Sequence, residues 1–198
     1  MKIEQARMTY STQIQSYREQ IGILSKKKQE LDKEIKRTPG GEELFGKEAA
    51  TLELTIQKLD EKQSEYQEYM SKLTEQWTAQ ANLVVSQQQG EAMGDAMEDL
   101  GKIMEVARRL MNGDIVPASD ERKLMEFDDK LYQAAKNIGE LRRRMEKERK
   151  EHKSLWEDEE PKEYEDPTEV ANNTEAFGPG PEIVSVEETM ASVEVPSE

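Results

Sequence analysis

Three groups of residues in this chain have residue types and a spacing that suit noncovalent binding to a partner. They are a methionine stripe, a basic run and a short apolar segment near the C-terminus. Methionine side chains are flexible and polarizable, so a surface of them can adapt to different helices. The members of the three groups are Met93, Met97, Met104 and Met111; Arg142, Arg143, Arg144, Lys147, Arg149 and Lys150; and Ile183, Val184 and Val186. All three groups indicate binding to other macromolecules.

Each group also has an ordinary structural explanation. Methionines at helical spacing fill cores more often than they bind partners. The basic run, residues 142–153, contains seven bases and three acids and no aromatic residue for base stacking, so nucleic acid is the less favoured partner. Cations there also suit the negative end of a helix dipole. The apolar segment is either a short motif that orders on a partner or part of a solubilising tail.

Motifs for catalysis are missing from the sequence. His152 is the only histidine, and the chain has no cysteine, phosphate-binding loop, His-Glu-x-x-His zinc motif or nucleophile elbow. Carboxylates are plentiful, but acid–base catalysis needs them in a partly desolvated cleft, which thin helical structures rarely provide. We therefore expect no enzyme activity, no cofactor and no metal site.

Acidic residues are concentrated at the end of the chain. The last 42 residues hold 14 of the 43 acidic residues but one of the 28 basic residues. This stretch also carries several prolines and glycines, and it has too little apolar surface to offset the entropy of ordering. We therefore predict that residues 157–198 form a disordered acidic tail. Its first acids, residues 157–160, directly follow the basic run, so one hypothesis is that they fold back on a basic patch.

Heptad spacing marks the first part of the chain. Apolar residues recur at alternating steps of three and four on both sides of Thr38-Pro39-Gly40-Gly41, where proline and glycine favour a turn. The two arms are of about equal length. This predicts an antiparallel coiled-coil hairpin over residues 1–85 with a turn at 38–46, with Ile21 opposite Tyr66. An intermolecular coiled coil is the alternative.

A shifted apolar frame follows and predicts a second helical pair over residues 86–156. Its turn is expected at 112–119, because Asn112-Gly113 favours a turn and Ser119 is a good helix N-cap. Three glycines interrupt the first helix of the pair, and each costs about 1 kcal/mol relative to alanine inside a helix. They are Gly90, Gly94 and Gly101. We expect this stretch to be the weakest part of the helical body.

Composition agrees with thin helical structures, because 34% of the residues are hydrophobic and 36% are charged. The predicted fold class is all-α: a coiled-coil hairpin, a second helical pair and a disordered acidic tail. The longest apolar run, Leu83-Val84-Val85, is too short to span a bilayer, so we expect a cytoplasmic protein without membrane insertion.

No motif ties the chain to a family, although in outline it resembles cytoplasmic coiled-coil adaptors, including hairpin proteins that accompany bacterial secretion and flagellar export. The expected function is that of a noncatalytic interaction or scaffold protein, which binds other proteins through its helical body and its tail. The alternative is a chaperone or export-associated factor that holds a client helix, and a homo-oligomer is also open.

Overall fold

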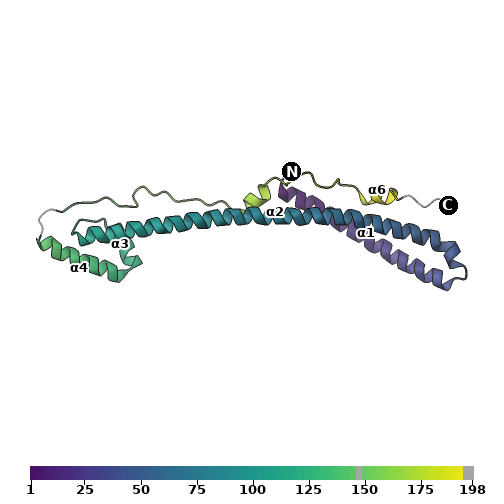
Figure 1. Ribbon diagram of the computed structural model, residues 1–198, viewed down its shortest axis with the longest axis horizontal. Coiled ribbons are helices and arrows are strands. Elements are labelled where there is room, and N and C mark those ends of the chain that lie inside the picture. The colour runs from purple at the N-terminus through teal and green to yellow at the C-terminus, as the bar shows by residue number, and fades with distance from the viewer. Residues whose placement is uncertain (146–148, 194–198) are drawn as a thin grey trace. The chain divides into compact units, whose positions relative to one another are not determined.

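The computed structural model describes residues 1–145 and 149–193 and is mostly helical, with no strand in those ranges, which confirms the all-α class. The helices are α1 (Ile3–Arg37), α2 (Gly41–Met111), α3 (Ala118–Phe127), α4 (Asp129–Met145), α5 (Pro167–Asn173) and α6 (Val186–Ala191) (Figure 1). Among the described residues, none of these helices combines the length and the apolar character needed to cross a membrane.

The chain divides into two compact units. Unit 1 comprises residues 1–84 together with the described residues from 165 onward, and unit 2 comprises the described residues of 85–164. Helix α2 contributes its first part to unit 1 and its last part to unit 2. Each unit has its own cluster of buried apolar side chains, so each is described separately.

Unit 1 is built on α1 and the first part of α2, which are joined by a short turn. Helix α1 ends at Arg37, and α2 begins at Gly41, so the turn is shorter than the predicted 38–46. Gly40 adopts a positive φ of 73°, which L-residues rarely take. Gly41 lies against the backbone of Ile35 so closely that a Cβ atom would collide with it. Two glycines in a row therefore permit the chain to reverse here.

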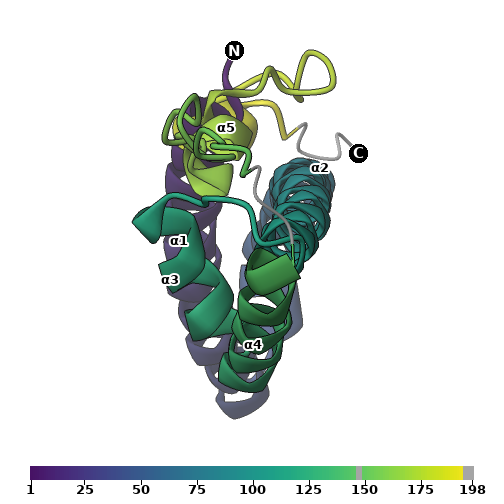
Figure 2. The same cartoon turned by 90° about the vertical axis from the view of Figure 1, so that its left-hand side faces the viewer.

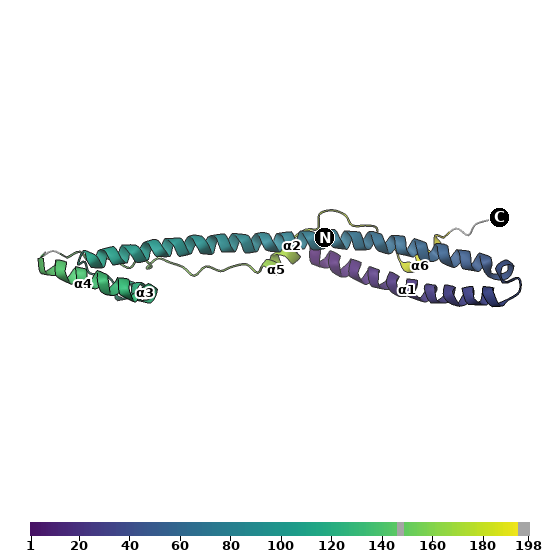
Figure 3. The same ribbon diagram turned by 60° about the horizontal axis from the view of Figure 1, so that its bottom comes forward.

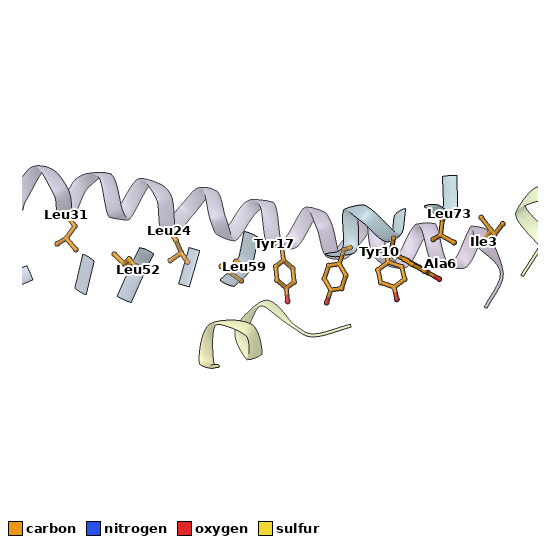
Figure 4. Close-up of a cluster of buried hydrophobic side chains, with 11 residues drawn as sticks. Ile3, Ala6, Tyr10, Tyr17, Leu24, Leu31, Leu52, Leu59 and Leu73 are labelled. Carbon is orange, nitrogen blue, oxygen red and sulfur yellow. The ribbon is translucent and has the colours of Figure 1, made fainter. Parts of the chain in front are cut away.

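The core of unit 1 is a seam between the two helices. Its buried residues are Ile3, Ala6, Tyr10, Tyr17, Leu24 and Leu31 from α1, and Leu52, Leu59, Tyr66, Tyr69 and Leu73 from α2 (Figure 4). Tyr66 packs edge-on against Tyr17, with ring centroids 5.5 Å apart, whereas the sequence placed it opposite Ile21. The register therefore differs from the prediction by about one helical turn.

Unit 2 places α3 and α4 side by side against the last part of α2 (Figure 2). Its buried core is formed by Val106, Ala107 and Leu110 of α2, Val116, Leu124 of α3, and Tyr132 and Ala135 of α4. Gly139 of α4 lies directly against the Leu110 carbonyl, where a Cβ atom would not fit. The turn after α2 includes Gly113 at a φ of 82°, as the Asn-Gly pair favours.

The disorder predicted for residues 157–198 is not confirmed. Residues 167–173 and 186–191 are helical, and both short helices lie beside α1 (Figure 3). Asp166 caps α5, and Ser185 with Glu188 forms a reciprocal capping box on α6. Composition predicted disorder because these residues bury little apolar surface themselves, but hydrogen bonds to α1 and to the first part of α2 give them a fixed place.

Candidate protein-interaction surfaces

The methionine stripe is largely exposed. Met93, Met97 and Met104 are 70%, 68% and 50% exposed, and Leu100, in the same heptad frame, is 43% exposed. We call these four residues the α2 stripe. The fourth predicted methionine, Met111, instead packs against the core of unit 2. An apolar stripe of this spacing that faces solvent is a mark of a surface that binds another helix.

A second apolar stripe runs along α4 with the same spacing. It consists of Ala134, Ile138, Leu141 and Met145, which we call the α4 stripe, and all four side chains are exposed. Ile138 is 47% exposed, Leu141 61% and Met145 85%. In both stripes the members follow one another at steps of four, three and four residues. The two stripes therefore have matching lengths and patterns.

The charges beside the two stripes are opposite in sign. Between residues 91 and 102, α2 carries Glu91, Asp95, Glu98 and Asp99 against Lys102. Helix α4 carries five bases, Lys130, Lys136, Arg142, Arg143 and Arg144, against two acids. The two helices are therefore electrostatically complementary as well as matched in apolar pattern.

Part of the basic run serves unit 2 internally. The Arg142 guanidinium donates to the Asn112 side chain at 2.7 Å, and Arg143 donates to the Gly113 carbonyl at 3.1 Å. These bonds satisfy acceptors at the C-terminal end of α2. Of the other predicted residues, Arg144, Arg149 and Lys150 are exposed, and Lys147 lies outside the described residues.

Two charged residues that follow the basic run, Glu159 and Lys162, contact α2. Glu159 pairs with Lys102, and Lys162 pairs with Asp95 at 2.6 Å. The Trp156 indole donates to Asp99 at 2.7 Å, while the Lys123 ammonium lies 3.9 Å from its ring centroid. Residues 156–162 are thereby fixed along unit 2, on charges that adjoin the α2 stripe.

Buried acids in unit 2 have structural partners. Asp120 is fully buried and accepts hydrogen bonds from the Ser154 hydroxyl at 2.6 Å and the Leu155 backbone amide at 3.0 Å. Burial raises the pKa of Asp114, but the 3.0 Å bond with His152, the Lys150 backbone bond and the charges of these two residues together lower it overall. Within the described ranges, no group of three or more acidic or histidine side chains could hold a metal ion. These contacts tie residues 150–155 to the helices.

Unit 1 contains a feature that the sequence reasoning missed, a row of tyrosine hydroxyls. The tyrosine row consists of Tyr10 and Tyr17 from α1 and Tyr66 and Tyr69 from α2, all buried in the seam. Each hydroxyl donates to a backbone carbonyl of the C-terminal segment: Tyr69 to Gly178 at 3.0 Å, Tyr10 to Pro181 at 2.8 Å, Tyr66 to Glu182 at 3.0 Å and Tyr17 to Val184 at 2.9 Å. Figure 4 shows the Tyr10 and Tyr17 hydroxyls on the side where this segment runs.

The tyrosine row acts as a set of donors. Burial raises the pKa of Tyr10, Tyr17 and Tyr69, so these hydroxyls stay protonated at neutral pH. The signal for this site was present in the sequence, because a tyrosine at a buried heptad position needs a partner for its hydroxyl.

The predicted apolar residues of the tail occupy different environments over this row. Ile183 is 46% exposed, Val184 is half-buried, and Val186 packs against the core of unit 1. The most buried side chain of the segment is Thr189, whose hydroxyl lies 2.6 Å from that of Tyr17. Contact of the segment with α1 and α2 therefore comes from its backbone, from Thr189 and from the partly buried Ala176, Val186 and Met190.

Comparison with known proteins gives no relative for this arrangement. No protein-family model, no curated protein and no solved structure matches the chain.

Proposed function

We propose that this chain is a noncatalytic helical scaffold that assembles with a second copy of itself through unit 2, with the α2 stripe of one copy on the α4 stripe of the other. The observation that carries the proposal is the exposure of four apolar side chains at heptad spacing on α2. A helix that exposes such a stripe gains free energy when a second stripe covers it, because apolar surface leaves water.

Two properties of α4 support it as the occupant. Its stripe repeats the spacing of the α2 stripe, which is what knobs-into-holes packing requires. Its flanks are basic where those of α2 are acidic, so the correct pairing is attractive and the pairing of like stripes is repelled. A foreign helix with the same basic flanks and apolar spacing would fit the same surface, which is how a scaffold would recruit a partner.

The remaining parts fit a supporting role. In this proposal α1 and residues 41–84 form an antiparallel coiled-coil hairpin that stiffens one unit, while unit 2 makes the contacts. The cysteine-free sequence suits a reducing compartment, so we place the protein in the cytoplasm.

Sedimentation equilibrium of the full chain tests the proposal. Wild type should form a reversible oligomer, and Met97→Glu should shift it toward monomer because a carboxylate is placed within the apolar contact and beside acidic neighbours. Ala92→Glu is the matched control, since Ala92 is exposed on the same helix about 100° around from Met93. A chain that is monomeric at all concentrations, or that loses assembly equally with both substitutions, contradicts the proposal.

A client-holding chaperone is the second candidate, favoured by the methionines at three of the four positions of the α2 stripe. It predicts that wild-type protein at a stoichiometric ratio keeps an aggregation-prone amphipathic peptide with basic flanks in solution. Light scattering measures this, and Met97→Glu should abolish the effect while Ala92→Glu retains it. A scaffold that joins only folded partners leaves the aggregation unchanged.

A further inference from the structure

The tyrosine row recognises the backbone of the C-terminal segment more than its side chains. Its four hydroxyls donate to carbonyl oxygens between residues 178 and 184, and the Val184 amide donates back to the Tyr66 hydroxyl at 2.9 Å. Within this stretch the side chains of Pro179, Glu182 and Ile183 are exposed, whereas the Phe177 ring just before it packs on Tyr69, with ring centroids 5.2 Å apart. Any extended peptide can offer such carbonyls, so the recognition is not restricted to this one segment.

Two positions do select the sequence of the bound segment. Gly180 lies over Tyr10 and Tyr69, and a Cβ atom there would collide with the Tyr10 ring and come within 2.7 Å of the Tyr69 ring. Thr189 is buried, and its hydroxyl is bonded to that of Tyr17. A matching peptide therefore needs glycine at the position that lies over Tyr10 and Tyr69, and a small residue with a hydroxyl nine positions later.

We infer that the tyrosine row is a binding site for an extended peptide of this chemistry, and that the chain's own residues 174–193 occupy it in cis. The ligand carries carbonyls in an extended stretch over the four hydroxyls, glycine at the point of closest approach and a buried threonine in a short helical turn. Within residues 174–193 Thr189 alone is buried, and Ala176, Val186 and Met190 are partly buried against the core, so apolar contacts add to the hydrogen bonds without enclosing the segment. A segment held mainly by exchangeable hydrogen bonds can be replaced by another that makes the same bonds.

The probe is a fluorescent synthetic peptide of residues 174–193, added to the full chain and followed by anisotropy. In wild type the tethered segment competes at an effective concentration on the order of millimolar, so the probe should bind weakly. Gly180→Ala in the chain weakens the tethered competitor by the collision with Tyr10 and leaves the tyrosine row unchanged. The probe should then bind at least about tenfold more tightly than to wild type.

Gly178→Ala is the matched control. It changes a glycine two residues away in the same segment, where a Cβ atom would meet nothing within 4 Å, and neither glycine has a positive φ. This variant should bind the probe as weakly as wild type does. A probe that itself carries the Gly180→Ala change should bind poorly to the Gly180→Ala chain, which places the trans peptide in the same site as the tethered one.

Hydrogen exchange of residues 178–190 shows whether Gly180→Ala has released the tethered segment, so that each result of the binding experiment can be interpreted. If Gly180→Ala releases the segment and the probe still fails to bind at up to roughly the effective concentration of the tether, the site accepts no second peptide and the inference is overturned. If Gly180→Ala leaves the protection of the segment unchanged, the closeness of Gly180 to Tyr10 does not control occupancy, and the inference is again overturned. Circular dichroism at 222 nm confirms that the helices persist in both variants.

Discussion

Asp120 should hold the segment of residues 150–156 to unit 2, and its removal should release that segment. The carboxylate is fully buried in the first turn of α3 and accepts bonds from Ser154 and Leu155, more than thirty residues later. The Ser119 hydroxyl donates a third bond to Asp120 at 3.0 Å, but Ser119 is exposed, so water can replace Asp120 as its partner. The two long-range bonds therefore carry the effect.

Asp120→Ala should destabilise unit 2 by about 3 kcal/mol, because each hydrogen bond to a charged group contributes about 1.5–3 kcal/mol and the half-exposed Ser154 donor recovers part of the loss in water. Asp120→Asn keeps the shape of the side chain but turns one hydrogen-bond acceptor into a donor. It should therefore lower the free energy of unfolding about half as much as Asp120→Ala does. Glu126→Ala on the same helix, where the side chain is exposed, should change the free energy of unfolding by less than about 0.5 kcal/mol.

Hydrogen exchange in the peptide covering residues 150–156 measures the release directly. A loss of about 3 kcal/mol corresponds to roughly a hundredfold faster exchange if the segment opens locally. Denaturation followed by circular dichroism gives the effect on the whole unit. Wild-type protection of residues 150–156 in Asp120→Ala would refute the assignment of Asp120 as the anchor.

Four further predictions concern single residues. Gly101→Ala should stabilise the protein by about 1 kcal/mol, because Gly101 lies within α2 with no other group near the place of a Cβ atom. Gly139→Ala should destabilise the protein by about 1–3 kcal/mol, because its Cβ atom would collide with the α2 backbone. Urea denaturation measures both changes. Bonds from Arg108 and then Arg109 lower the pKa of Glu105 from its ordinary value of 4.5 to about 2. The contribution of this ionised carboxylate to stability is therefore complete above about pH 4.5 and is lost as the pH falls toward 2, and Glu105→Gln should flatten this part of a pH–stability curve. Tyr17→Phe should speed hydrogen exchange around Thr189, because it removes the 2.6 Å bond between the two hydroxyls, and unchanged exchange there would count against the role given to Tyr17.

The helical parts of the fold were predictable because their signals are local. Heptad spacing marked the long helices, and the Thr38-Pro39-Gly40-Gly41 turn marked the point where the chain reverses. The register was not predictable, because any two heptads can pair in several registers with apolar residues in contact. In the structure the register brings tyrosine rings into contact. Tyr66 packs edge-on against Tyr17, and the ring centroids of Tyr10 and Tyr69 lie 4.8 Å apart.

The methionine stripe was predicted by its spacing, but its exposure was not. Periodicity identifies the face of a helix that carries apolar residues and does not say whether another element of the same chain covers it. Met111 falls where α3 and α4 pack on α2, and Met93, Met97 and Met104 do not. That distinction depends on where α3 and α4 lie, which is a property of the folded unit.

The place of the C-terminal segment follows from a polar requirement of the unit 1 core. Leucine at the positions of Tyr10, Tyr17, Tyr66 and Tyr69 would need nothing beyond the two helices, whereas four buried hydroxyls need acceptors that the helix backbones, bonded internally, cannot supply. Within the described residues every buried side-chain nitrogen and oxygen has a partner, and for the tyrosine row the partners are carbonyls of residues 178–184. A tail with few apolar residues is therefore ordered by the polar groups of another part of the chain, which explains why its composition alone predicted disorder. The same requirement means that an incoming peptide must bring its own carbonyls to the row, since a purely apolar ligand would leave the four hydroxyls without acceptors.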